Sequence, residues 1–334
     1  MKVMTLRSPG GLDNLALVER DRPEPGPSEI LVRVHANSLN YHDCVVAAGV
    51  LPVADGRVMM SDGAGEVVAI GDDVTLFYPG EKVMSTYYPN WQKGLAEPSF
   101  QMFKPGENVD GYASEYVVVP ESWVTRIPRG FSFAEAATLP CAGLTAWRGV
   151  VIEGKVSPGD VVLVQGTGGV SIFALQFAKA AGARVIATSS SEAKLERLRE
   201  LGADHVINYK ETCEWGRRVK ELTGGRGADI VIETGGAGTL TQSLLAAAIN
   251  GRVILIGVLT GISGDFPVAL AFHSQLTIKG VAVGSREDQL SMIRGIEAND
   301  IRPVIDSIRP LEGLADAYRE QEAYRHFGKL CIEL

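Results

Sequence analysis

A buried strand that runs directly into a glycine-rich turn, and then into a helix, constrains the fold of this chain more than any other feature. Residues 161–165 read Val-Val-Leu-Val-Gln, and residues 166–171 read Gly-Thr-Gly-Gly-Val-Ser. Apolar residues then recur at helical spacing as far as Gly182. Glycines in such a turn let the backbone approach a pyrophosphate, whose charge is stabilised by the free N–H groups and dipole of the helix N-terminus. The pattern therefore predicts a dinucleotide-binding turn; an unliganded turn and a methyltransferase-type nucleotide site are the alternatives. The residues expected to contact the cofactor here are Gly166, Thr167, Gly168, Gly169 and Val170.

The residues after the second predicted strand indicate which dinucleotide binds. NAD sites place an acidic residue about 20 residues after the turn, where it holds the ribose 2′-hydroxyl. Here Ser189, Ser190 and Ser191 occupy that stretch. A carboxylate about 4 Å from a 2′-phosphate would cost on the order of 4 kcal/mol at an effective dielectric constant near 20, so its absence favours NADPH. Lys194, on the next predicted helix, can either reach the phosphate or remain a solvated helix charge.

A regular alternation of strands and helices extends from the turn through the second half of the chain. Apolar strands begin near residues 161, 184, 205, 229 and 252, and a sixth is expected near residue 276. This spacing predicts an α/β architecture, a doubly wound parallel sheet covered by helices on both faces. Ligands of such sheets bind at the carboxyl ends of the strands, so Gly257 is a further candidate cofactor contact.

The amino-terminal part has a different character. Short apolar or alternating runs at 30–34, 65–70 and 116–119 lie between Gly and Pro turns, which predicts a β-rich region. The tail adds a helix at about 287–298 and a final strand at 329–334 that can return to this region. A chain of 334 residues exceeds what one core usually serves, so two domains are expected.

Composition excludes several classes of function. The net charge is −8 and the basic residues are dispersed, so neither a nucleic-acid partner nor a membrane surface is expected. The amino terminus lacks a signal peptide, and no apolar run has the length of a membrane span, so a cytoplasmic location is expected. The four cysteines are scattered singly, which argues against disulfides and C-x-x-C metal motifs.

Residues 87–111 form a long stretch without clear periodicity that is rich in aromatic residues. A loop of this length is uncommon unless it is functional. We expect a lobe that covers the active-site cleft; a dimer contact and simple core packing are the alternatives. The aromatic residues are Tyr87, Tyr88, Trp91, Phe100 and Phe103.

Several motifs, taken in order along the chain, resemble those of the medium-chain dehydrogenase/reductase superfamily. They are Pro23-Glu-Pro-Gly-Pro27, Asn40-Tyr-His-Asp43, Asp62-Gly-Ala-Gly-Glu-Val-Val-Ala-Ile-Gly71, Ala136-Ala-Thr-Leu-Pro-Cys-Ala-Gly-Leu-Thr145, the turn at Gly166, and His326-Phe-Gly-Lys329. The resemblance implies a GroES-like catalytic domain, residues 1–125 and 270–334. It also implies a Rossmann nucleotide-binding domain between these parts, residues 126–269.

The chain departs from the zinc-dependent members at the positions of their catalytic ligands. Asn40 stands where the first cysteine would be, Ser61 where the histidine would be and Asp62 at the glutamate, so only Cys141 matches a ligand. Catalytic zinc sites usually have three protein ligands, and one thiol should give no useful affinity. We therefore expect no metal; the alternative is an improvised site. That site would consist of His42, Asp43, Asp62 and Cys141.

Without zinc, the pattern resembles the quinone-oxidoreductase-like branch, in which NADPH reduces quinones or conjugated carbonyls. Asn40 and Tyr41 are the candidate hydrogen-bond donors to the developing enolate, and His42 is a candidate proton source because its ordinary pKa lies near operating pH. Val45 and Val46 stand where quinone reductases often carry tyrosines, so enones and aldehydes stay open as substrates. The other hypotheses are a zinc alcohol dehydrogenase with unusual ligands and an NADPH-binding protein with little turnover.

The resemblance implies further contacts. Thr145 would contact the nicotinamide, Tyr209 would lie near the 2′-phosphate, and residues 327–329 would close over the cofactor. The small-molecule carbonyl substrate would lie among pocket residues from several segments, and a homodimer would form through the strand-like, apolar region 254–279. The closing residues are Phe327, Gly328 and Lys329, and the pocket residues are Asp62, Tyr87, Trp91 and Cys141.

Overall fold

The computed structural model describes residues 1–334, which form two compact units. We call residues 1–144 with 283–334 the β-rich unit, and residues 145–282 the α/β unit. These limits differ from the 125/126 and 269/270 limits expected from the sequence. Helix α2 (Phe133–Ala137) packs against strands of the β-rich unit, and strand β14 (Thr277–Gly280) pairs with a strand of the α/β unit. The segments on either side of the expected limits therefore belong with the sheets that they contact.

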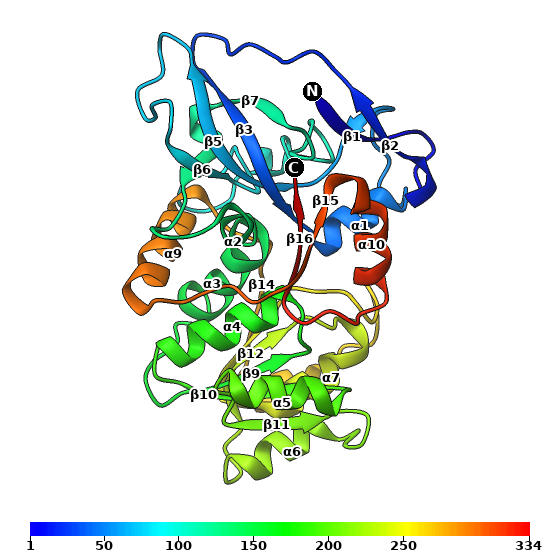
Figure 1. The fold of residues 1–334 in the computed structure, drawn as a ribbon. Helices are drawn as coiled ribbons and strands as arrows, with labels where there is room; N and C mark the ends of the chain where they lie inside the picture. Colours follow the sequence, from blue (N-terminus) through cyan, green and yellow to red (C-terminus); the bar gives the residue numbers. More distant parts are fainter. The chain divides into compact units, whose positions relative to one another are not determined.

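The β-rich unit is built on a seven-stranded sheet, in the order β15-β16-β3-β5-β6-β8 with β7 also paired to β3, and a three-stranded sheet, β2-β1-β4. The final strand β16 lies in this unit and returns the tail to it (Figure 1). It runs antiparallel to β3, with Cys331 opposite Ser38. The strands are β1 (Lys2–Leu6), β2 (Leu15–Glu19), β3 (Glu29–Ser38), β4 (Arg57–Val58), β5 (Asp62–Ile70), β6 (Lys82–Ser85), β7 (Tyr116–Pro120), β8 (Val124–Arg126), β15 (Ile305–Pro310) and β16 (Lys329–Glu333).

The β-rich unit also contains α-helices and short helical turns. The α-helices, besides α2, are α1 (Tyr41–Ala47), α9 (Arg286–Asn299) and α10 (Leu314–Glu322). Short helical turns are η1 (Leu12–Asn14), η2 (Pro98–Gln101), η3 (Glu121–Trp123), η4 (Leu139–Gly143) and η6 (Leu311–Gly313). Helix α9 matches the expected helix near 287–298, whereas α1 and α10 were not anticipated.

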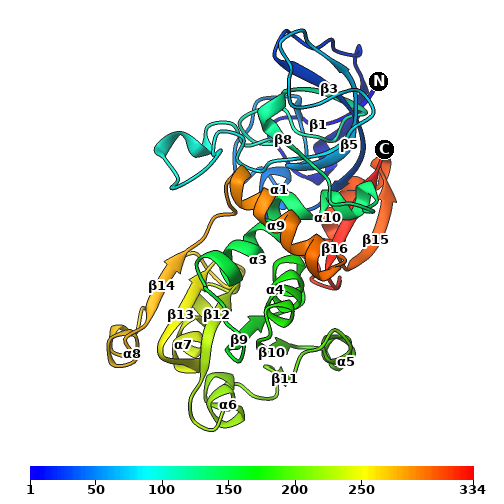
Figure 2. The same ribbon diagram turned by 90° about the vertical axis from the view of Figure 1, so that its left-hand side faces the viewer.

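The α/β unit contains a six-stranded sheet in the order β11-β10-β9-β12-β13-β14, and every pair in it is parallel (Figure 2). The central strand β9 is buried along its whole length, and Trp215 and Val219 of α6 pack with Leu163. The predicted α/β class and the Rossmann-type parallel sheet are therefore confirmed. The strands are β9 (Val161–Gln165), β10 (Arg184–Ser189), β11 (His205–Asn208), β12 (Ala228–Glu233) and β13 (Ala247–Leu255), together with β14. The helices are α3 (Leu144–Trp147), η5 (Arg148–Ile152), α4 (Gly169–Ala180), α5 (Glu192–Glu200), α6 (Trp215–Leu222), α7 (Ala237–Ala246) and α8 (Val268–His273).

The region 254–279, expected to be strand-like, is only partly so. It contains the end of β13, a loop, helix α8 and the first residues of β14. Apolar composition alone does not separate a short helix from a strand, and this accounts for the difference. None of the helices has both the length and the apolar character needed to cross a membrane.

Candidate functional site

The glycine-rich turn of the α/β unit leaves an open space at the N-terminus of α4. Gly166 has φ +72°, a conformation that favours glycine, and a Cβ added at Gly166 or Gly168 would meet no atom within 4 Å. Gly168 caps α4 without a side-chain hydrogen bond, so the first N–H groups of the helix are not capped by a side chain there. The third position of the motif, Ser171, is buried and donates from Oγ to the carbonyl of Gln165 at 2.6 Å. This geometry fits a pyrophosphate group.

The predicted ribose-binding residues meet at the carboxyl ends of β10 and β11. Ser189 is the last residue of β10 and is buried, Ser190 is half-buried, and the N–H of Tyr209 donates to the Ser189 carbonyl at 3.1 Å. Lys194 is half-buried on α5. The nearest acidic residue along the chain, Glu192, begins α5 and accepts from Asn208 Nδ2 at 2.8 Å. The end of β10 therefore carries serine hydroxyls, and none of the residues 189–191 has a carboxylate.

Packing within the protein already explains the residue type at two other predicted cofactor contacts, Gly257 and Gly328. A Cβ at Gly257 would lie 2.0 Å from the Thr234 carbonyl oxygen, and one at Gly328 would lie 2.3 Å from that of Val304. Glycine is thus required at both positions by close backbone approach. Phe327 is buried, and its N–H donates to Asp306 Oδ1 at 3.1 Å. Thr145, another predicted contact, is buried on α3.

In the β-rich unit, three remote segments meet around Asn40. Asn40 is the N-cap residue of α1, and its side-chain Nδ2 donates to Ser61 Oγ at 3.2 Å. Lys329 Nζ donates to Asn40 Oδ1 at 2.7 Å and also to the carbonyl of Leu39. Lys329 is only 4% exposed, so this is a buried ammonium group. The sequence marked Asn40 as a catalytic residue and Lys329 as a cofactor contact, and the contact between their side chains was not anticipated.

Asp62 and Cys141 lie beside this group. Asp62 is fully buried, and its Oδ2 accepts from the backbone N–H of Cys141 at 3.1 Å. Burial raises the pKa of Asp62 to about 7, although the positive charge of Lys329 opposes this shift. The carboxyl group of Asp62 therefore changes its charge close to neutral pH.

The residues at the three ligand positions and at the glutamate position come together, but they do not fit a zinc ion. They offer an amide, a hydroxyl, a carboxyl and one thiol, and the Lys329 ammonium adds a positive charge beside the amide. No group of three or more His, Cys, Asp or Glu side chains in the structure is arranged to hold a metal ion. The improvised set is not among such groups, and the Asp43 oxygens accept instead from the backbone N–H groups of Asn40 and Ser61, both at 2.9 Å.

His42 is held between two carboxylates. Its Nε2 lies 2.5 Å from Glu107 Oε2, and its Nδ1 lies 3.9 Å from Asp43 Oδ1. Burial lowers the pKa of His42, but hydrogen bonds and charges from Asp43 and Glu107 outweigh burial and raise it to about 9. This pKa lies above the ordinary value on which the sequence prediction relies, and its direction favours a charged ring at pH 7. Tyr41, next to it, is 44% exposed.

Glu107 also pairs with Lys104, whose Nζ lies 2.5 Å from Glu107 Oε2. Burial raises the pKa of Glu107, but hydrogen bonds from His42 and Lys104 outweigh burial and lower it to about 2. These two residues were missed in the sequence, because a Lys and a Glu three residues apart in an aperiodic segment give no signal that they contact His42.

The aromatic residues of segment 87–111 mostly pack on one another. Trp91 contacts Tyr88 and Phe100, and its Nε1 donates to the Gly94 carbonyl at 3.0 Å. Only Tyr87 contacts a predicted catalytic residue, with its ring edge-on to His42 at 5.7 Å between centroids. Core packing therefore accounts for Trp91, whereas Tyr87 adjoins the polar group around His42.

Comparisons with known proteins agree with both units. Residues 26–129 match the alcohol dehydrogenase GroES-like domain, and residues 169–298 match the family described as zinc-binding dehydrogenase. A zinc-type alcohol dehydrogenase-like protein of Schizosaccharomyces pombe is 40% identical over 97% of this chain and 96% of its own length. A crystal structure of an NAD-dependent alcohol dehydrogenase is 38% identical, with a TM-score of 0.92 over 100% of both chains.

More distant solved structures carry other activities in their names. A quinone oxidoreductase of Pseudomonas syringae pv. Tomato DC3000 is 28% identical, with a TM-score of 0.84 over 100% of this chain and 99% of the other. A crotonyl-CoA carboxylase/reductase in complex with NADP is 25% identical, with a TM-score of 0.89 over 100% and 94%.

Proposed function

Because the chain belongs to the medium-chain dehydrogenase/reductase superfamily of oxidoreductases, we propose that it is a zinc-independent, NADPH-dependent reductase of quinones, enones or related carbonyl compounds. The observation that carries the proposal is the hydrogen bond from buried Lys329 to Asn40, at a position where zinc-dependent members have a ligand. An ammonium group here supplies positive charge without a metal, and the amide that it orients can donate to an oxygen.

NADPH, when bound, supplies a hydride to the substrate. The chain's own groups then stabilise the negative charge that develops on the substrate oxygen and deliver a proton. The Lys329 ammonium has a third N–H beyond the two used in the contacts described above. The Asn40 amide, besides its bond to Ser61, also faces the buried Asp62 carboxyl, whose pKa its hydrogen bond lowers. Both are preorganised by burial, which is the condition under which such donors stabilise an enolate most strongly.

His42 is the proposed proton donor. Asp43 and Glu107 keep its ring protonated, so it carries a proton at neutral pH. Tyr41 is the second candidate proton donor, because its side chain is exposed rather than packed in the core. We propose that Asp62 and Cys141 line the substrate pocket beside Asn40, with Tyr87 at its His42 side.

The preference for NADPH rests on the serine hydroxyls at the end of β10, where the first carboxylate along the chain, that of Glu192, accepts from Asn208 on β11. Ser189, Ser190 and Tyr209 are proposed to surround the 2′-phosphate, with Lys194 supplying positive charge. The NADP complex of the crotonyl-CoA carboxylase/reductase supports this choice, whereas the name of the NAD-dependent relative favours NADH. The cofactor contacts of Thr145, Gly257, Phe327 and Gly328 are also part of the proposal.

An alcohol dehydrogenase is the second candidate, because the S. pombe relative and the NAD-dependent relative bear that name. An activity screen distinguishes the reductase from the alcohol dehydrogenase. It tests conjugated carbonyls, quinones, plain aldehydes and alcohols, each with the NADP and the NAD cofactor. We expect NADPH oxidation with an enone or quinone. Turnover confined to alcohol oxidation with NAD would contradict the proposed function.

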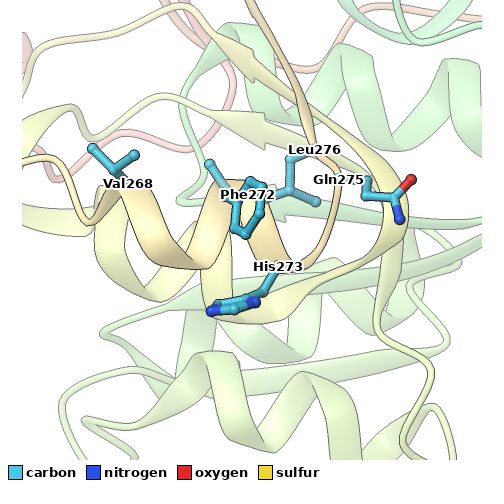
Figure 3. A pocket seen from close by; sticks show the side chains of 6 residues that line it. Val268, Phe272, His273, Gln275 and Leu276 are labelled. Atoms are coloured by element: carbon cyan, nitrogen blue, oxygen red, sulfur yellow. The ribbon is translucent and has the colours of Figure 1, made fainter.

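We also propose a homodimer formed through the α/β unit. Strand β14 lies at the edge of the six-stranded sheet, and the neighbouring helix α8 exposes 65% of Val268 and 73% of Phe272 (Figure 3). An apolar patch beside an unpaired strand edge favours pairing with a second copy. Sedimentation should show a dimer that Phe272→Asp dissociates; a monomeric wild-type chain would contradict this.

A further inference from the structure

A buried carboxylate in the α/β unit joins the cofactor turn to a neighbouring loop. Glu233 is the last residue of β12 and is fully buried. Its Oε1 accepts from the N–H groups of Gly235 and Gly236, at 2.7 and 2.9 Å, and from Thr239 Oγ1 at 2.6 Å. These three bonds fix the loop between β12 and α7.

The other oxygen of Glu233 reaches the strand that leads into the turn. Its Oε2 accepts from Gln165 Nε2 at 2.9 Å and from Ser243 Oγ. Gln165 is the last residue of β9 and directly precedes Gly166. Strands β9 and β12 are adjacent and parallel, so their carboxyl ends lie at the same edge of the sheet.

The backbone of Gln165 is held from both sides as well. Its carbonyl accepts from Ser171 Oγ at 2.6 Å and from Thr234 Oγ1 at 3.1 Å. The residue before the turn is therefore fixed through its side chain by Glu233, and through its carbonyl by α4 and by the loop after β12.

We infer that Glu233, acting through Gln165, is a positioning residue that preorganises the glycine turn for the cofactor. The inference rests on the proposed binding of NADPH at this turn. A turn that is fixed before binding loses less conformational freedom when the cofactor binds. The hydrogen bonds of Glu233 and Gln165 therefore contribute to affinity without touching the ligand. Charge-assisted hydrogen bonds to a buried carboxylate are strong enough to do this.

Asp229 offers a matched control, because it joins the same two strands at their opposite ends. Its Oδ2 accepts from the Val161 N–H at 2.8 Å, at the amino edge of the sheet. Asp229→Asn should lower thermal stability, as Glu233→Gln does, but it lies away from the turn. A purely structural role for Glu233 would make the two variants behave alike.

The test is calorimetric titration of NADPH into the full chain. We expect Glu233→Gln to raise the Kd by about tenfold, Asp229→Asn to leave it unchanged, and kcat at saturating NADPH to stay near wild type in both. If Glu233→Gln does not fold, Gln165→Leu removes the link to β9 while leaving the loop bonds of Glu233, and it should raise the Kd similarly. Unchanged affinity in the folded variants, or an equal loss in Asp229→Asn, overturns the inference. Absence of NADPH binding by the wild-type chain would instead overturn the proposed function.

Discussion

The α/β unit and the β-rich unit build their candidate sites in different ways. In the α/β unit, the cofactor turn is one continuous segment, 166–171, whose shape depends on glycine backbone geometry. In the β-rich unit, Asn40, Ser61 and Lys329 come from three segments, the first and last 289 residues apart. Recognition by backbone groups is therefore encoded locally, whereas recognition by side chains requires the whole sheet to fold first.

This comparison predicts that the two sites can be damaged separately. Lys329→Met should have the largest effect, because it removes the buried ammonium from Asn40 and from the neighbourhood of Asp62. We expect kcat to fall by about 100-fold or more, with a much smaller effect on NADPH affinity, in steady-state kinetics and binding titrations.

Lys220 provides the control for this variant. Its Nζ also donates to backbone carbonyls, those of Ala247 and Arg226, but in the α/β unit. Lys220→Met should reduce stability and leave kcat near wild type. An equal loss of kcat in both variants would mean that Lys329 acts only through stability.

Ser189→Asp tests the cofactor site of the α/β unit. A carboxylate at the end of β10 would repel a 2′-phosphate and accept from a ribose hydroxyl, so the ratio of kcat/KM for NADPH to that for NADH should fall by about 100-fold. His205→Asp, at the amino end of β11, adds the same charge at the opposite edge and should leave the ratio unchanged. An unaltered preference in Ser189→Asp would show that the ribose pocket lies elsewhere.

Glu107→Gln should give the smallest effect, a shift in pH dependence. The pKa of His42 is raised to about 9, so the imidazolium persists at lower pH and is lost as pH rises through 9. Removing the Glu107 charge lowers this pKa, and the alkaline limb of kcat should move down by about one pH unit or more. Lys104→Met removes the other partner of Glu107 but leaves His42 paired, so its limb should not move down. A limb that stays in place in Glu107→Gln would exclude His42 as the proton donor.

The contrast also explains what the sequence could and could not predict. The six parallel strands follow from a repeated hydrophobic pattern, and the turn follows from residues that are neighbours along the chain. The sequence motifs identified Asn40, Asp62 and Lys329 one by one as site residues. The contact between Lys329 and Asn40, however, depends on the pairing of β16 with β3. The pKa of His42 depends on Glu107, and segment 87–111 offers no pattern that would place this residue.

The absence of helical or strand periodicity limited the prediction elsewhere. Helix α8 falls in a region predicted to be strand-like because it is short and apolar, and the domain limits that the resemblance implies differ from those of the compact units. Packing of α2 on the β-rich sheet is a tertiary property that no local pattern records.

The central claim is that an oriented buried ammonium, rather than a metal ion, serves the catalytic site. The most direct measurement is elemental analysis of the purified chain together with NADPH-dependent enone or quinone turnover before and after chelation. The account predicts less than about 0.1 zinc per chain and unchanged turnover. About one zinc per chain, with turnover that is lost on chelation and restored by zinc, would contradict it.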